Sequence, residues 1–171
     1  MVSVFLSARF GPAGAEKEVI WLRAQLEARG VTVYPSANPG NLDRQADIAN
    51  GIKRADLFAL LAQSHYGENT GNPMCSYEEF KFAKALGKPM AWINMNGGAP
   101  PANPVVAMGL QGIVYKMWEQ EGAIVDWIAS KLPGGVDVAP AMAGLSLGAA
   151  EEPTAEVRPL PHSTPLPWNA Q

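Results

Sequence analysis

The sequence has very few residues that could form disulfides or bind metals. It contains one cysteine, Cys75, and two histidines, His65 and His162. A single cysteine excludes a disulfide within the chain, and these three side chains do not have the close spacing that is typical of zinc sites. We therefore expect no metal and a reducing, cytoplasmic environment.

Excess positive charge and long apolar runs are also absent. Lysine and arginine total 13 against 16 aspartates and glutamates, which gives a formal net charge of −3. Without a basic surface the chain is not expected to hold a phosphate backbone, so nucleic acid is not a predicted partner. No apolar run approaches the ~20 residues of a membrane span, and the opening "MVSVFLSARFG" has no basic region before its apolar stretch. We expect neither membrane insertion nor export.

The apolar content that is present is enough for one globular core. The chain has 171 residues, of which 47% are hydrophobic, and this length favours a single domain. From Pro133 onward the composition shifts to proline, alanine and glycine without a sustained period. We expect a domain over residues 1–133 and a flexible tail over 134–171.

Strand-like and helix-like patterns alternate along the predicted domain. Apolar runs predict strands at 2–7, 31–35, 57–64 and 88–95, with a short edge strand at 112–118. Amphipathic patterns predict helices at 15–29, 48–56, 77–86 and 123–132. Such alternation implies parallel pairing with right-handed crossovers. The predicted fold is an α/β three-layer sandwich with a central, flavodoxin-like parallel sheet of about five strands.

The segment "MCSYEEFKFAKALGKP" places two glutamates at the start of the third helix. Ser76 and Glu79 have the spacing of a capping box, in which both side chains serve only to begin the helix. The helical period gives a second interpretation, because Glu79 shares a face with Phe82, Ala83 and Leu86, whereas Glu78 points elsewhere and can pair with Lys81. An inward carboxylate beside the carboxyl ends of the strands is a candidate for chemistry.

The order of these segments resembles a TIR domain, the Toll/interleukin receptor homology fold, over about residues 1 to 133. The matching segments are Ser7 to Arg9 after the first strand, Pro39 and Gly40 in the next loop, the helix Ile48 to Asp56, Ser64 and Tyr66 after the third strand, and Cys75 before the helix that bears the glutamates. The tryptophan that often precedes the cysteine in that family is Met74 here.

The resemblance implies cleavage of the nicotinamide–ribose bond of NAD by a glutamate on this helix. By its spacing to Ala83 and to Gly87-Lys88 the residue is Glu79, and Glu78 is the second choice, since a Cys-x-x-Glu pattern selects it. NAD is then a substrate and no cofactor is required. The products would be nicotinamide and ADP-ribose or a cyclic ADP-ribose signal, in antiphage or immune defence, with homo-oligomerisation through TIR–TIR contacts and possible partner proteins.

Loss of nicotinamide leaves an oxocarbenium-like sugar, which one nearby carboxylate can stabilise. Around it we expect a cation for the diphosphate, for which Arg9 is the best candidate, and an aromatic wall from Phe5, Phe10 or Tyr34. Ser7 and Cys75 complete the predicted substrate-binding set. A thiol nucleophile formed by Cys75 and His65 lacks a third, orienting residue and is not favoured.

Two alternative functions stay open at this point. The phrase "EEFKFAKALGKP" is also similar to nucleoside deoxyribosyltransferases, whose glutamate attacks a deoxyribose. Those enzymes usually carry an Asp and a Gly-Thr before the glutamate, where this chain has Asn72, Pro73 and Met74. The other alternative is a non-catalytic TIR adaptor that acts by self-association through the loop "SANPGNLD", its exposed helices and the proline-rich tail.

Overall fold

The computed structural model describes residues 1–11, 14–35, 44–118 and 121–135. The predicted Pro39-Gly40 motif and all of the predicted tail beyond residue 135, including His162, lie outside these residues. Within the described part, none of the helices is both long enough and apolar enough to cross a lipid bilayer.

Five parallel strands form one sheet in the order β2-β1-β3-β4-β5. They are β1 (Ser3–Ala8), β2 (Thr32–Tyr34), β3 (Leu57–Ala62), β4 (Met90–Asn94) and β5 (Tyr115–Met117). This is the flavodoxin-like order, so the predicted fold class is confirmed. Every residue of β1 and of β3 is buried, as expected for central strands covered on both faces.

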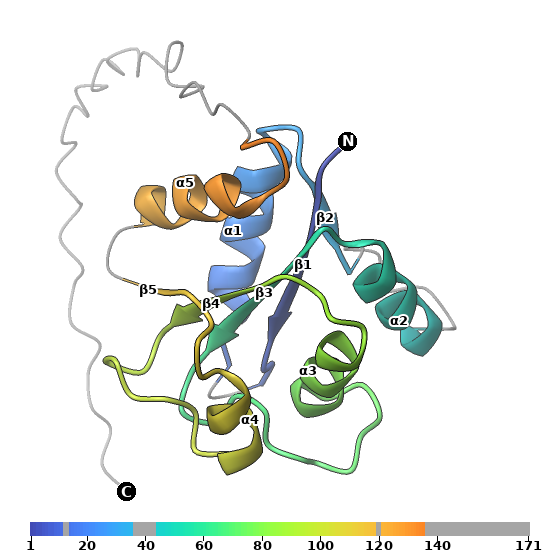
Figure 1. Ribbon diagram of the computed structural model, residues 1–171, viewed down its shortest axis with the longest axis vertical. Coiled ribbons are helices and arrows are strands. Elements are labelled where there is room, and N and C mark those ends of the chain that lie inside the picture. The colour runs from blue at the N-terminus through green and yellow to red at the C-terminus, as the bar shows by residue number, and fades with distance from the viewer. Residues whose placement is uncertain (12–13, 36–43, 119–120, 136–171) are drawn as a thin grey trace, which may run out of the picture. The chain divides into compact units, whose positions relative to one another are not determined.

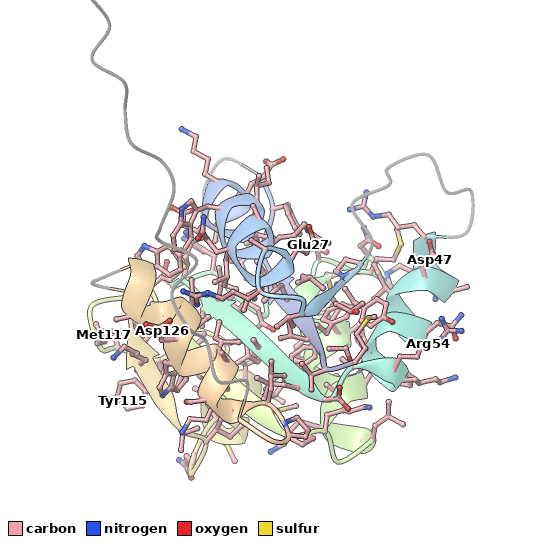
Figure 2. All side chains as sticks on the ribbon, turned by 90° about the horizontal axis from the view of Figure 1, so that it is seen from above. Glu27, Asp47, Arg54, Tyr115, Met117 and Asp126 are labelled. Atoms are coloured by element: carbon pink, nitrogen blue, oxygen red, sulfur yellow. The ribbon has the colours of Figure 1, made fainter. Side chains whose placement is uncertain are left out.

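Helices cover both faces of the sheet (Figure 1). They are α1 (Glu16–Glu27), α2 (Arg44–Arg54), α3 (Ser76–Ala85), α4 (Pro104–Gly109) and α5 (Glu121–Lys131). α1 and α5 pack on one face, and α2, α3 and α4 lie on the other. Seen from above, Tyr115 and Met117 mark the β5 edge and Asp47 and Arg54 mark α2 (Figure 2).

The alternation of side chains along β1 decides what each face receives. Val4, Leu6 and Ala8 join the apolar cluster under α1 and α5. Phe5 points to the other face, where its ring stacks on Phe58 with centroids 5.4 Å apart. Because the period of a strand is two, Ser7 follows Phe5 on the α2–α3 face and brings a hydroxyl to the carboxyl end of the strand.

Candidate active site

The candidate site lies where the carboxyl ends of β1 and β3 meet. β2 pairs with one side of β1 and β3 with the other, so the chain switches direction across the sheet at this point. In open α/β sheets ligands bind in the crevice beyond such a switch point. The end of β1, the loop after β3 and the first turn of α3 all converge here, which brings Ser7, Tyr66 and Glu79 together.

Glu79 is the buried acid of this site, with 9% of its surface exposed. The Ser7 hydroxyl donates a hydrogen bond of 2.6 Å to its Oε2 oxygen. Ser7 Oγ also lies 2.7 Å from the Tyr66 hydroxyl, and both of these side chains are fully buried. Since Ser7 gives its only proton to Glu79, Tyr66 is the donor in the second bond. Tyr66 and Ser7 thus form a chain of donors that ends on Glu79.

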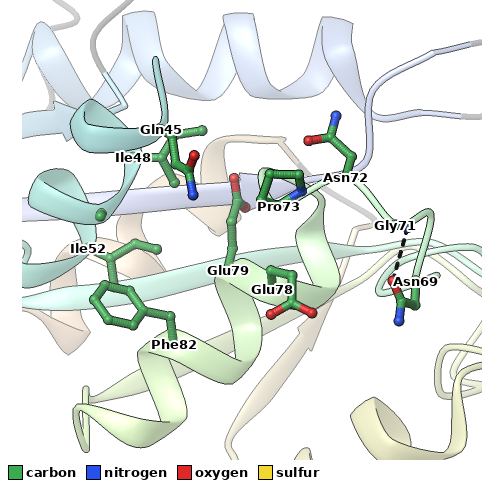
Figure 3. Close-up of a pocket in the computed structure, with 11 residues that line it drawn as sticks. Gln45, Ile48, Ile52, Asn69, Gly71, Asn72, Pro73, Glu78, Glu79 and Phe82 are labelled. Carbon is green, nitrogen blue, oxygen red and sulfur yellow. Dashed lines mark hydrogen bonds between the residues drawn. The ribbon is translucent and has the colours of Figure 1, made fainter. Parts of the chain in front are cut away.

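The other carboxylate oxygen of Glu79 is available to a substrate. Among the described residues, the hydrogen bond to this carboxylate ends on Oε2, and none is donated to Oε1. Figure 3 shows the carboxylate directed into the space between α2 and the loop that contains Pro73. One oxygen is therefore held in place while its partner faces a cavity.

The capping-box interpretation of Ser76 and Glu79 is wrong. The residue that precedes the helix is Cys75, and no side chain caps α3. Ser76 lies inside the first turn, and its hydroxyl accepts a 3.0 Å hydrogen bond from the Gly67 amide. A bond across nine residues replaces the local one, so the Glu79 carboxylate does not serve to begin the helix.

Burial controls the ionisation of Glu79. Desolvation raises the pKa of its carboxyl from 4.5 to about 7, although the Ser7 hydrogen bond and the positive charge of Arg44 act in the opposite direction. Burial and the nearby Glu79 charge also raise the pKa of Tyr66 well above its ordinary value, so this phenol stays protonated and able to donate. The site holds an acid that can change its charge near neutral pH.

Glu78 has a different environment. Its carboxylate forms an ion pair with Lys81 at 3.2 Å, as predicted, and its side chain is 37% exposed. In Figure 3 it turns away from Glu79. The helical period thus correctly separates the two glutamates, but it places Leu86 wrongly, because α3 ends before Leu86 and that side chain is 42% exposed.

Two hollows meet at Glu79. The first, which we call the amide hollow, has a volume of about 490 Å³ and lies between α2 and α3. Its lining combines apolar side chains, three side-chain amides and, besides Glu79, the carboxylate of Glu78: Ile48, Ile52, Phe82, Gln45, Asn69, Asn72 and Glu78. The second, the arginine hollow, has a volume of about 320 Å³, and Arg9, Arg44, Phe10, Glu68, Thr70 and Cys75 are among its lining residues. Ile48, Asn72 and Glu79 border both.

Three of the predicted substrate-binding residues, Arg9, Phe10 and Cys75, line the arginine hollow. Ser7 lines neither hollow and reaches the site only through Glu79. Tyr34 also lines neither, since its side chain packs against the core under α2. The predicted aromatic wall at Phe5 is wrong, because that ring is fully buried against Phe58.

Several residues of the site were not predicted. Tyr66 appeared only as part of a motif, and the donors Gln45, Asn69, Asn72 and Arg44 were not singled out. The asparagine-rich loop "HYGENTGNP" follows β3 at the carboxyl edge of the sheet, where ligands bind, so its position predicts that it belongs to the site, but it does not single out Asn69 or Asn72. Nothing local marks Gln45 or Arg44, which reach the site only because α2 packs beside α3.

The Cys75–His65 pair has no catalytic arrangement in the described part of the chain. His65 Nδ1 lies 2.6 Å from Glu68 Oε1, so the ring is engaged by that carboxylate. No hydrogen bond between described residues joins the Cys75 thiol to a base. The described residues also contain no cluster of three His, Cys, Asp or Glu side chains that could hold a metal ion.

No known protein family matches the sequence, and no curated protein does. Solved structures do resemble the fold. A CMP N-glycosidase, BcmB, of Clostridium botulinum has a TM-score of 0.50 and 19% identity over 74% of this chain and 96% of its own. A 2-deoxyribosyltransferase of Bacillus psychrosaccharolyticus has a TM-score of 0.48 and 18% identity, with 73% and 91% covered. An archaeal flavodoxin has a TM-score of 0.39 and 14% identity, with 71% and 80% covered.

At these identities the likeness extends to the fold alone. None of the three structures is described as a TIR domain. Membership of that family therefore stays a prediction.

Proposed function

We propose that this protein cleaves the N-glycosidic bond of a nucleoside or nucleotide, with Glu79 as the carboxylate that acts on the sugar. The observation that carries the proposal is the state of this side chain. Glu79 is buried, its Oε2 is held by Ser7, and it borders two hollows at the switch point of the sheet. A group held in this way is organised before the substrate arrives.

In the proposed reaction the bond between C1′ and the base nitrogen breaks, and its electron pair leaves with the base. The sugar gains positive charge, which the Glu79 carboxylate stabilises by lying close to C1′ or by bonding to it transiently. Water then supplies the oxygen that completes C1′, and its released proton goes to the departing base or to solvent. A second nucleobase in place of water gives transfer in place of hydrolysis.

The buried carboxylate favours an enzyme over the non-catalytic adaptor. Placing this group in the interior disfavours its ionised form, as the raised pKa records, and therefore lowers stability at neutral pH. Self-association through surface loops gives no reason for such an arrangement, whereas catalysis does. The likeness of the fold to a CMP N-glycosidase supports the same class of reaction.

The proposal is broader than the NAD-cleaving activity that the TIR resemblance implies, and it is closer to the transferase alternative. NAD belongs to the class, because its nicotinamide is joined to ribose by an N-glycosidic bond. The two hollows that share Glu79 could accept either a mononucleotide or part of a dinucleotide. The assay described below distinguishes a mononucleotide substrate from a dinucleotide substrate.

The test is release of free base by the purified full-length chain. Cytidine, CMP, dCMP, NAD and nicotinamide riboside are incubated separately, and the products are separated by chromatography. We expect cleavage of at least one substrate and a loss of roughly 100-fold or more in Glu79→Gln, because the amide cannot stabilise a cation as a carboxylate does.

Glu78→Gln is the matched variant on the same helix turn. Loss of activity in Glu78→Gln with Glu79→Gln still active would transfer the role to Glu78. Full activity in both variants, or no cleavage of any substrate, would reject the proposed function. Addition of a free base to the reaction distinguishes transfer from hydrolysis.

A further inference from the structure

We infer that the arginine hollow holds the 5′-phosphate of the substrate, with Arg44 as its main cation, so that the enzyme acts on nucleotides in preference to free nucleosides. This inference rests on the proposed function and specifies its substrate. Three observations support it: the two hollows differ in the chemistry of their lining, Glu79 lies between them, and Arg9 but not Arg44 forms an ion pair with a described acidic residue.

The amide hollow has the chemistry of a base-binding site. Ile48, Ile52 and Phe82 offer apolar surface to a flat ring. Asn69 Oδ1 accepts a hydrogen bond from the Gly71 amide at 3.0 Å, and Asn72 Oδ1 accepts one from the Met74 amide at 2.9 Å (Figure 3 shows the first). With their oxygens engaged, these side chains present NH₂ donors, which match the carbonyl oxygens and ring nitrogens of a base.

The arginine hollow has a different character, because it contains two guanidinium groups. Arg9 is already engaged, since it forms an ion pair with Glu68 and donates to the His65 carbonyl oxygen at 3.2 Å. Glu68 Oε1 also lies 2.6 Å from His65 Nδ1. The hydrogen bonds that Glu68 forms with His65 and with Arg9 lower the pKa of its carboxyl. Glu68 therefore stays ionised and balances the charge of Arg9.

Among the residues that the structure describes, Arg44 has no acidic partner of the kind that Arg9 has in Glu68. Its side chain is exposed and lines the hollow, and no described acidic residue forms an ion pair with it. Arg44 and Glu79 line the same hollow, and the positive charge of Arg44 accordingly acts to lower the pKa of the Glu79 carboxyl. A guanidinium at the first residue of α2 can offer two parallel donors to a phosphate.

The order of the hollows matches the order of groups in a nucleotide. The base is attached to C1′ and the 5′-phosphate is carried by C4′, the two carbons that flank the ring oxygen, and Glu79 stands where the amide hollow and the arginine hollow meet. A sugar placed over Glu79 thus directs its base into one hollow and its phosphate into the other. Arg44 also offsets the negative charge that a phosphate would bring close to the catalytic carboxylate.

The experiment compares each nucleotide with its unphosphorylated form. We measure kcat/KM for CMP against cytidine and for nicotinamide mononucleotide against nicotinamide riboside, so that the members of each pair differ only in the 5′-phosphate. In the wild-type chain we expect the phosphorylated member of the cleaved pair to be preferred by about 10- to 100-fold, the range of one charge-assisted contact. Arg44→Ala should remove most of that preference, measured as the ratio of the two kcat/KM values within each variant. The ratio is the readout because loss of the Arg44 charge also raises the pKa of Glu79 and so lowers activity on both members of a pair.

Arg54→Ala is the matched control, because this exposed arginine is the last residue of the same helix and lines neither hollow. It should leave the preference unchanged. A second measurement does not depend on turnover. Isothermal titration of CMP and of NAD into Glu79→Gln, with and without Arg44→Ala, should give weaker binding of the same nucleotide in the double variant by a similar factor.

The outcomes separate this inference from the proposed function. Equal kcat/KM for nucleotide and nucleoside overturns the phosphate site and leaves the glycosidase in place. Absence of cleavage rejects the proposed function, and the titration then decides the inference alone. Binding that Arg44→Ala weakens supports the phosphate site, whereas binding that is unchanged or undetectable in both variants overturns it.

Discussion

At the scale of single residues, the hydrogen bond from Ser7 to Glu79 is the contact that most directly controls the proposed chemistry. Stabilising a sugar cation requires the ionised carboxylate, and burial raises the pKa of that carboxyl to about 7. The Ser7 bond opposes this effect. Tyr66, which donates to Ser7, supports the same bond from behind. Both are positioning residues, since they act on the substrate only through Glu79.

The pH dependence of activity tests this arrangement. We expect kcat/KM of the wild-type chain to rise with pH through an apparent pKa near 7, because protonated Glu79 is inactive. In Ser7→Ala the hydrogen bond that lowers the pKa is lost, so the rise should move to higher pH. Tyr66→Phe should move it in the same direction by less. The measurement is the pH profile of base release from pH 5 to pH 9.

Ser130→Ala is the control for this profile. Ser130 lies on α5, and its hydroxyl bonds to the Trp127 carbonyl oxygen. Its profile should coincide with that of the wild-type chain. A Ser7→Ala profile that also coincides, at whatever absolute rate, would show that Ser7 has only a structural role.

At the scale of elements, the sequence predicts what depends on local pattern. The five strands follow from apolar runs, and α1, α3 and α5 follow from apolar spacing bounded by turn residues. α2 begins at Arg44, four residues before the predicted start, because its first turn is polar and carries no period. α4 was not predicted, since six residues are too few to show a helical period, although Asn103 before Pro104 is a recognisable helix start.

Gly14, in the loop after β1, allows a close approach of backbone segments. A Cβ added to Gly14 would lie 2.4 Å from the Arg9 carbonyl oxygen and 2.8 Å from Phe10 Cα. The same loop is closed by a 3.0 Å hydrogen bond from the Ala15 amide to the Arg9 carbonyl oxygen. Any larger side chain must therefore displace the backbone that presents Arg9 and Phe10 to the arginine hollow.

Gly14→Ala should lower the free energy of unfolding by about 1–3 kcal/mol, because backbone atoms cannot move aside as a flexible side chain can. Urea titration followed by circular dichroism measures the change. Gly122→Ala on α5 is the matched control, since no atom lies within 4 Å of its added Cβ, and helix propensity makes it neutral or slightly stabilising. Equal stability of the two variants would show that the loop does not need the close approach at residue 14.

At the scale of the whole molecule, the site was harder to predict than the fold. A helical period was enough to direct Glu79 inward, because that is a property of one helix. The helical period could not predict the hydrogen-bond partners of Glu79, since Ser7 is 72 residues from Glu79 and 59 residues from Tyr66 in the sequence. Which hydroxyl meets which carboxylate depends on strand order and on how α3 packs, and a single sequence does not specify these. The same limit applies to Arg44, which meets the site only through the packing of α2.

The pH dependence of the free energy of unfolding tests whether the Glu79 carboxyl is as hard to ionise in the folded chain as the proposed function assumes. The pKa of Glu79 is about 7 in the folded chain and near 4.5 when unfolded. Between these values the folded state binds more protons, so this group lowers the free energy of unfolding as the pH rises, by roughly 3 kcal/mol in total. Glu79→Gln has no such titration. Its stability relative to the wild-type chain should therefore increase from pH 5 to pH 8, as measured by urea denaturation at each pH.

Glu78→Gln separates the effect of burial from the effect of removing a charge. The Glu78 carboxylate is partly exposed and paired with Lys81, so its variant should differ from the wild-type chain by a nearly constant amount over the same pH range. A constant difference for Glu79→Gln as well would mean that this carboxyl ionises as easily in the folded protein as in the unfolded one. The stored instability at neutral pH, which distinguishes a catalytic acid from a structural one, would then be absent, and the reason to prefer an enzyme over an adaptor would be lost with it.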